Sequence, residues 1–267
     1  MKCVERFLPV AIFCAMSLFI SACAVPRLTS KDHQEPVTFW TPDQWRQTML
    51  ERLERWRHFQ AGYQAKWTDS LERVWRAKIL VTASLPDQLR VEILNTWGQV
   101  QGLFLLKDSW ATLWVVPEKT VYTSTRHEAL LEKLVGIALA GTELAPALLG
   151  LPSEKVLEGS LPRRLQDGTV VLAAKESQHQ WRRLLTLCSD QERLCGMDFT
   201  EAGTSLSVLF RYEAQGNDRD IPSSLTFHGP TGLVELTRTF LDRPASFSPE
   251  NFELPPLGQT VQVVEIP

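Results

Sequence analysis

Two cysteines in the C-terminal half of the chain, Cys188 and Cys195, are close enough in sequence for their thiols to join. An even pair of cysteines in an oxidising compartment predicts a disulfide. Closing so short a loop stabilises a fold by about 2–3 kcal/mol. A metal site is the other chemistry open to this pair. It is less favoured, because no histidine or second cysteine pair stands nearby at ligand spacing.

A further cysteine, Cys23, closes an apolar run that begins near Phe7 and follows a charged head at residues 2–6. These are the parts of a secretory signal, and the run is shorter than the roughly 20 apolar residues of a membrane span. Its last residues resemble the lipobox of bacterial lipoproteins, Ile20-Ser21-Ala22-Cys23. The resemblance implies removal of residues 1–22 and lipidation of Cys23. The alternative is an ordinary signal peptide, or an uncleaved anchor, with a chance cysteine.

The lipid on Cys23 would fix where the protein works. One acyl chain holds a protein to a membrane only marginally, and lipoproteins of this kind carry two or three. Ala24, not aspartate, follows the cysteine; by resemblance to Gram-negative lipoproteins this implies the periplasmic face of the outer membrane. Residues 23–39, with the polar segment 25–36, are then a lipidated N-terminus and flexible tether. The covalent lipid on Cys23 is the one cofactor we expect.

The remaining reactive side chains do not form a recognisable catalytic or metal-binding pattern. The histidines are isolated from one another in sequence: His33, His58, His127, His179 and His228. The chain contains no His-Glu-x-x-His pair, Gly-x-Ser-x-Gly elbow or phosphate-binding glycine loop. We therefore expect a protein that is not an enzyme and holds no metal.

The charge and the hydropathy of the chain exclude some classes of binding partner. The net charge is −3 at pH 7 and the charges are scattered, so the chain lacks the basic stripe that binding to a phosphate backbone requires. We expect no nucleic-acid partner. After the signal, no second apolar run is long enough to span a bilayer.

The elements that must position these residues begin with a helix. Thr41 and Pro42 are typical of a helix start, and apolar residues then recur at helical spacing to about Phe59. The period changes to two over residues 75–82 and 89–93, and again at 104–106 and 110–116, which predicts an antiparallel meander with one apolar face. A Trp97-Gly98 corner separates two of these strands.

The middle of the chain predicts two short helices, at residues 127–136 and 142–149, the second ended by Gly150 and Pro152. Five more strands follow, at residues 169–174, 181–188, 206–212, 223–227 and 233–241. The segment from 247 to 267 is rich in proline and should lie along a sheet edge. Residues 40–267 thus form one mainly β domain with helices (α+β). Its sheet of about ten antiparallel strands is large enough that it must curl.

Three stretches resemble the LolB family of outer-membrane lipoproteins: Leu89–Gln99, Glu128–Gly136, and Leu144 with Leu148–Pro152. Related bacterial lipoproteins also share the pattern near Phe252, Leu254 and Pro255. The resemblance implies a strongly curved, unclosed antiparallel half-barrel with a helical lid, whose apolar cavity holds acyl chains. LolB accepts lipoproteins from the periplasmic carrier LolA, so a LolA-like carrier and lipid or lipoprotein cargo are the implied partners.

One family feature falls on a single position of this chain. LolB has a protruding loop with an exposed leucine before a glycine, which serves delivery into the membrane; here that position is Trp97, before Gly98. Tryptophan also favours membrane interfaces, so the residue could keep the role. The alternative is that Trp97 folds back onto the sheet.

Strand parity suggests which apolar residues face the cavity: Trp75, Ile79, Val91, Ile93, Phe104, Leu106, Val208 and Phe210. Residues of this kind belong more often to an ordinary packed core than to a ligand site.

Three functions are consistent with these observations. The first is a LolB-like acceptor that binds acyl chains and assists their insertion in the outer membrane. The second is a binding protein for another lipid or hydrophobic ligand, or a subunit of an envelope assembly. The third and least favoured is a periplasmic hydrolase.

Overall fold

The computed structural model describes residues 41–135, 139–164, 170–175, 182–188, 190, 192–201, 204–213, 218–256 and 261–266. All the elements below belong to the compact unit Trp40–Pro267. The predicted signal peptide, lipobox and tether, Cys23 included, lie outside the described residues.

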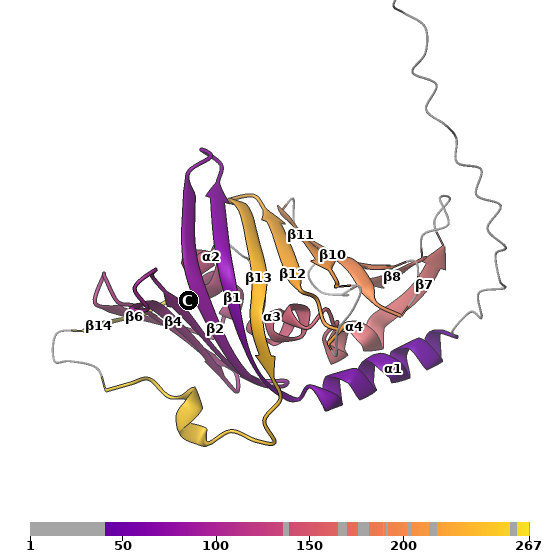
Figure 1. Ribbon diagram of the computed structural model, residues 1–267, viewed down its shortest axis with the longest axis horizontal. Helices are drawn as coiled ribbons and strands as arrows, with labels where there is room; N and C mark the ends of the chain where they lie inside the picture. The colour runs from indigo at the N-terminus through magenta and orange to yellow at the C-terminus, as the bar shows by residue number, and fades with distance from the viewer. Residues whose placement is uncertain are drawn as a thin grey trace, which may run out of the picture. The chain divides into compact units, whose positions relative to one another are not determined.

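Fourteen strands in this part of the chain join into one sheet (Figure 1). The first meander comprises β1 (His58–Asp69), β2 (Val74–Ser84), β3 (Gln88–Leu94), β4 (Val100–Lys107), β5 (Trp110–Val115) and β6 (Thr120–Ser124). The second comprises β7 (Ser160–Arg164), β8 (Val170–Lys175), β9 (Arg182–Leu187), β10 (Leu194–Glu201), β11 (Thr204–Arg211), β12 (Ser224–Gly229) and β13 (Gly232–Asp242).

The two meanders meet where β1 pairs antiparallel with β13. A last strand, β14 (Gln262–Glu265), pairs parallel with β6 and forms one edge of the sheet, while β7 forms the other. Since these two edges are the ends of the strand order, the sheet is not closed into a barrel. The architecture is the unclosed, mainly β fold with helices that the sequence predicts.

In the described residues, four α-helices and one short 3-10 helix (Pro249–Phe252) accompany the sheet. The α-helices are α1 (Pro42–Arg55), α2 (His127–Val135), α3 (Gly141–Leu148) and α4 (Glu154–Gly159). The predicted start of α1 is confirmed, because the Thr41 hydroxyl accepts a hydrogen bond from the Gln44 N–H and the Gln44 side chain accepts one from the Thr41 N–H. Trp45, Met49 and Leu53 form its buried stripe. The prediction that the helix reaches Phe59 is wrong, since Phe59 is a buried residue of β1.

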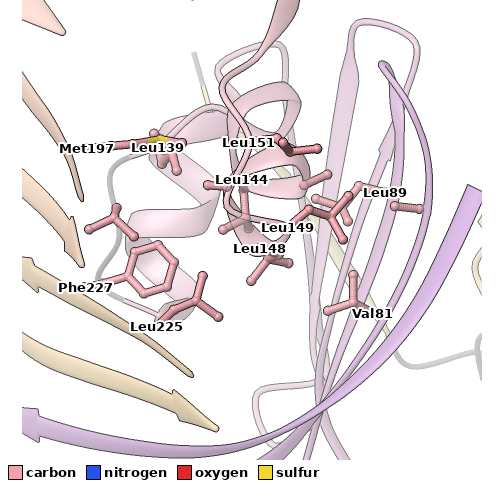
Figure 2. Packing of buried hydrophobic residues seen from close by; sticks show 14 of the residues in the cluster. Val81, Leu89, Leu139, Leu144, Leu148, Leu149, Leu151, Met197, Leu225 and Phe227 are labelled. Carbon is pink, nitrogen blue, oxygen red and sulfur yellow. The ribbon is translucent and has the colours of Figure 1, made fainter. Parts of the chain in front are cut away.

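Helix α3 and the turn after it fill the space between the two meanders. Figure 2 shows Leu144, Leu148 and Leu149 between side chains of β2 and β3 on one side and of β12 on the other. The buried Tyr63 hydroxyl of β1 donates a hydrogen bond to the Leu148 carbonyl oxygen (3.3 Å). Burial raises the pKa of Tyr63, so this hydroxyl remains a donor at neutral pH. The helices therefore form part of the packed core.

The turn after α3 depends on a glycine. Gly150 has φ +67°, and a Cβ at this position would lie 2.6 Å from the Tyr212 hydroxyl and 2.7 Å from Pro222. Glycine thus provides both the left-handed backbone that ends the helix and the room for the second meander.

The sheet has more strands than the ten or so that the sequence predicts. β1 was not predicted, because the first helix was expected to continue to Phe59, which is already part of this strand. β6 is short, and β7 carries Pro162 at the sheet edge. In β10 a register shift between Leu194 and Gly196 breaks the alternation of buried residues. Helix α4, only six residues long, is also absent from the prediction.

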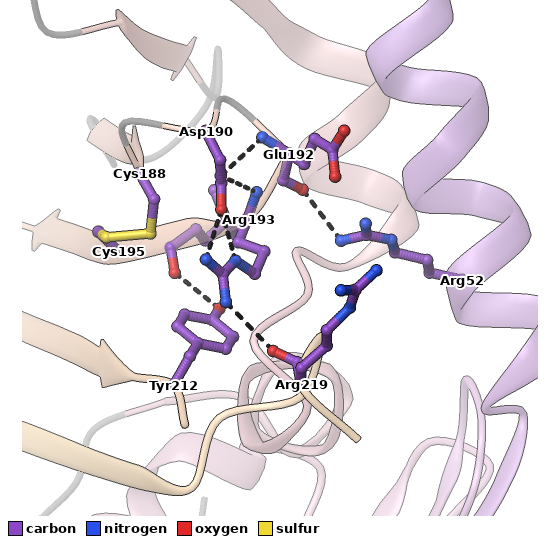
Figure 3. The surroundings of a disulfide bond; sticks show 9 residues. Arg52, Cys188, Asp190, Glu192, Arg193, Cys195, Tyr212 and Arg219 are labelled. Carbon is purple, nitrogen blue, oxygen red and sulfur yellow. Dashed lines mark hydrogen bonds and ion pairs between the residues drawn. A yellow bond between two sulfur atoms is a disulfide. The ribbon is translucent and has the colours of Figure 1, made fainter. Parts of the chain in front are cut away.

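A disulfide joins Cys188 to Cys195 across the β9–β10 hairpin, with the two Cα atoms 4.9 Å apart (Figure 3). Within the loop, the Asp190 carboxylate accepts hydrogen bonds from the backbone N–H groups of Glu192 and Arg193 and from the Arg193 guanidinium. Desolvation raises the pKa of Asp190, but these hydrogen bonds outweigh it and hold the pKa below its usual value. Arg52 of α1 donates to the Glu192 carbonyl oxygen (2.9 Å), which ties the loop to the first helix.

Candidate functional site

An apolar groove of about 580 Å³ opens at one end of the core-facing side of the sheet. It is formed by strands β1 to β5 and β13 with two adjoining turns. Its lining residues are Ala65, Trp67, Asp69, Trp75, Arg76, Ala77, Ile79, Ile93, Gln101, Gly102, Val115, Pro117, Thr231 and Val234. On β1, Ala65 and Trp67 continue the alternation of the buried residues Ala61 and Tyr63. The groove is therefore an extension of the core face beyond the part that α3 fills.

Two tryptophans form one wall of the groove. Trp67 and Trp75 are register partners in the β1–β2 ladder, and their rings meet edge to face with centroids 6.2 Å apart. The Arg73 guanidinium lies over the Trp75 ring, 5.2 Å from its centroid. This arrangement leaves a broad aromatic surface facing an apolar space, which suits a hydrophobic ligand.

The only carboxylate among the groove-lining residues is held by its neighbours. Asp69 accepts hydrogen bonds from the backbone N–H groups of Leu71 and Arg73 and pairs with the Arg73 guanidinium (2.6 Å). Desolvation raises the pKa of Asp69, but these hydrogen bonds outweigh it and lower the pKa below its usual value. Asp69 is thus an ionised turn-forming group at neutral pH, and it does not have the raised pKa of a general acid.

The structure divides the predicted cavity residues into two sets. Trp75, Ile79 and Ile93 line the groove. The other predicted residues lie in the packed core and outside the groove: Val91, Phe104, Leu106, Val208 and Phe210. Gly141 of α3 explains part of this, because a Cβ there would lie 2.9 Å from the Leu106 side chain. Helix α3 packs directly on Leu106 and Phe104.

Sequence reasoning missed one wall of the groove. Ala65 and Trp67 lie on β1, where residues 59, 61, 63, 65 and 67 alternate as apolar side chains. That period-two pattern was available in the sequence. Val115 and Val234 were not predicted either. Alternation along a strand shows which face of the sheet a residue is on, but it does not show whether a helix covers that residue.

Trp97 lies at the tip of the β3–β4 hairpin. The Asn95 carboxamide oxygen accepts hydrogen bonds from the backbone N–H groups of Trp97 and Gln99 (2.9 and 3.0 Å), and Gly98 adopts φ +81°. The Trp97 side chain is 87% exposed, so it does not fold back onto the sheet. Ile93, near the end of the same hairpin, lines the groove, so Trp97 and the groove lie at the same end of the sheet.

A second cleft of about 450 Å³ lies on the opposite face of the sheet, between Phe240 and the segment around Asn251. Two of its charged groups, Arg90 and Glu92, already have protein partners. Arg90 pairs with Glu92 (2.6 Å) and also donates to the Glu253 carbonyl oxygen (2.9 Å). We therefore place the candidate site in the apolar groove.

Possible metal ligands do not gather in the part of the chain that the structure describes. No three His, Cys, Asp or Glu side chains of these residues come close enough to hold a metal ion. His58, His127 and His228 lie on β1, α2 and β12, and His33 and His179 fall outside the described residues. Among the described helices, none is long and apolar enough to cross a membrane.

Comparison with solved structures identifies the architecture. A LolA superfamily protein from Nitrosomonas europaea superposes with a TM-score of 0.52 at 11% sequence identity, covering 78% of this chain and 97% of that one. The fold is that of the LolA superfamily. A domain described as an outer membrane lipoprotein-sorting protein, from Vibrio parahaemolyticus, has a TM-score of 0.50 at 12% identity, covering 79% of this chain and 97% of that one. No known family profile and no curated protein sequence matches the chain. At these identities the likeness to the LolA superfamily concerns the fold alone.

Proposed function

We propose that this protein is a lipoprotein anchored through Cys23 at the periplasmic face of the outer membrane. In this proposal it binds acyl chains, free or as part of a lipoprotein, in the apolar groove and assists their insertion in the membrane. No covalent chemistry is needed, because transfer follows differences in affinity between carrier, groove and bilayer. A LolA-like periplasmic carrier would supply the cargo.

The observation that carries this proposal is the apolar groove itself. Its volume of about 580 Å³ falls within the range of about 300–1,000 Å³ that is common for small-molecule sites. Trp67, Trp75, Ile79 and Ile93 give it a continuous apolar wall, and its one carboxylate, Asp69, is already paired with Arg73. Such a surface gains free energy by covering a hydrocarbon chain and offers little to a polar ligand.

Trp97 supports the transfer part of the proposal. The resemblance to LolB assigns it the loop position where that family has an exposed leucine. Trp97 is solvent-exposed, and it lies at the same end of the sheet as the groove. An indole favours the headgroup region of a bilayer. We expect Trp97→Glu to fold normally and to keep acyl binding while slowing lipid handover to vesicles. Marked unfolding of this variant would show that Trp97 is a structural residue instead.

The test of groove binding uses a matched pair of substitutions on one strand. Ala77→Phe places a ring in the groove, whereas Leu80→Phe adds a ring on the opposite face of β2. With a fluorescent fatty acid as the probe, we expect at least tenfold weaker binding for Ala77→Phe and little change for Leu80→Phe. Equal binding by both variants would contradict the groove as the site.

Two further measurements separate this function from the alternatives. Mass spectrometry of the native protein extracted from membranes should report an acylated Cys23 at the N-terminus together with retained lipid. Depletion of the protein should leave lipoproteins at the inner membrane if it is a lipoprotein acceptor. Retained lipid without that effect would instead indicate a binding protein for another hydrophobic ligand.

A further inference from the structure

The β1–β2 hairpin carries apolar side chains into solvent. Leu71 is 70% exposed, Val74 45% and Trp75 48%; we refer to these three residues as the hairpin tip. Trp75 also lines the groove. Large exposed apolar side chains gathered at one turn mark a surface that another apolar phase or partner covers.

The hairpin tip projects beyond β3, whereas β13 runs beside β1 as far as Asp69, which lies opposite Gly232. β2 pairs with β3 only from Lys78 onward, where Lys78 lies opposite Leu94. Residues Val74–Ala77 therefore extend past the end of β3, and Figure 1 shows the hairpin rising above the adjoining strands. Trp97, on the next hairpin, points from the same end of the sheet.

Positive charge lies directly behind the hairpin tip. Arg76 and Lys78 of β2 are exposed and follow Val74 and Trp75 along the strand. Arg76 lines the groove as well as a cleft that it shares with Lys78, and neither has an ion-pair partner among the residues that the structure describes. The other charges nearby are mostly neutralised, because Arg73 pairs with Asp69 and Lys66 pairs with Glu235 (2.6 Å). Glu72 is the one exposed carboxylate at the turn.

We propose that the hairpin tip is a second membrane-contact element, which enters the headgroup region of an anionic bilayer while Arg76 and Lys78 contact lipid phosphates. Exposed apolar side chains with cations beside them are the combination that binds anionic membrane surfaces. This contact would bring the mouth of the groove to the bilayer, and its purpose rests on the proposed function.

The test measures which end of the sheet faces the lipid. The full chain, anchored in vesicles of phosphatidylethanolamine and phosphatidylglycerol, carries an NBD fluorophore on Leu71→Cys. A matched preparation carries it on Trp110→Cys, an exposed position at the opposite end of the sheet. We expect doxyl-labelled lipids to quench the fluorophore at position 71 and to leave position 110 unquenched. Equal quenching at both positions, or none at position 71, would overturn the proposal.

The contribution of the cations is tested with variants of equal net charge. Replacing Arg76 and Lys78 by glutamine should weaken the contact of the hairpin with the membrane. The ratio of membrane-bound to free hairpin should fall by about fivefold for each cation removed, because each cation near an anionic surface contributes about 1 kcal/mol. The control replaces the exposed Arg46 and Arg55 of α1 by glutamine and should change nothing. Equal quenching in vesicles of phosphatidylcholine alone, or no effect of the first pair of substitutions, would also overturn the proposal.

These outcomes are distinct from those of the groove test. Fatty-acid binding is measured on the two labelled preparations that keep Arg76, because Arg76 lines the groove, and it reports on the groove. Intact binding with an unquenched position 71 contradicts only the membrane contact, whereas lost binding contradicts the proposed function. If position 71 is unquenched by lipid but becomes shielded as the protein concentration rises, the hairpin tip joins two copies of the chain and the membrane proposal fails.

Discussion

Asp69 determines the shape of the hairpin tip through a few short hydrogen bonds. Its carboxylate accepts from the backbone N–H groups of Leu71 and Arg73, while its backbone N–H donates to the Arg73 carbonyl oxygen (3.1 Å). Between them, Glu72 has φ +61°. At the residue scale, one ionised side chain thus holds the turn that presents Leu71 to solvent.

The charge on Asp69 makes this turn sensitive to acid. Because the pKa of Asp69 is lowered in the folded protein, its contribution to stability is complete above the ordinary carboxyl value of about 3.9 and is lost as pH falls through the lowered value. Titration of the amide chemical shifts of Leu71 and Arg73 by NMR should therefore give a midpoint below this ordinary value. Asp69→Asn keeps an acceptor oxygen but removes the titration, so its shifts should stay flat. A midpoint at or above the usual value would contradict this account.

At the element scale, two hairpins are held by different means. The β3–β4 turn with Trp97 relies on the Asn95 side chain and Gly98, whereas the β9–β10 turn relies on a disulfide and on Asp190. The second hairpin also contacts α1 through Arg52. Disruption of the β9–β10 hairpin should therefore loosen the packing of the first helix as well.

The disulfide gives a quantitative prediction. Replacing Cys188 and Cys195 together by serine should lower the free energy of unfolding by about 2–3 kcal/mol, because the unfolded chain gains freedom in a short loop. Urea denaturation followed by circular dichroism measures the change. Fatty-acid binding should persist below the transition, since the hairpin does not line the groove. An unchanged urea midpoint would show that the hydrogen bonds around Asp190 hold the hairpin without the disulfide.

Elements with a regular pattern were predictable and irregular ones were not. The capping residues and apolar stripe of α1, the alternation in β2 and β3, and the two central helices follow from local periodicity. β10 was missed because a register shift interrupts its alternation, and β7 because it is short and contains a proline. Local sequence also says nothing of the pairing of β1 with β13, which joins segments from the two ends of the domain.

At the scale of the whole molecule, the proposed anchor and the proposed groove have separate tasks. In our proposal the lipid on Cys23 fixes the location, and the unit Trp40–Pro267 binds the ligand. The groove, Trp97 and the hairpin tip all lie at one end of the sheet. A tethered domain that presents this end to the bilayer would have a short path for an acyl chain.

This division of tasks can be tested by moving the anchor. The mature chain with Cys23→Ala, exported behind the signal peptide of a soluble periplasmic protein, should lose membrane attachment and keep the fatty-acid affinity of the anchored form. Fractionation measures the first property and probe displacement the second. If the affinity falls together with attachment, the groove alone is not the binding site, and the lipidated N-terminus takes part in it.

The sequence by itself determined a mainly β domain with a curled, one-sided apolar sheet and a cysteine pair at disulfide spacing, and it predicts a lipidation signal at Cys23. These features depend on local periodicity and short motifs, which are defined by residues that are close together in the sequence. Only the tertiary structure decided which apolar residues are core and which are open to a ligand. Phe104 and Ile93 have the same character in the sequence, yet Phe104 is covered by α3 and Ile93 lines the groove. Whether an apolar side chain is covered depends on elements far away along the chain, and residue type and strand parity do not contain that information.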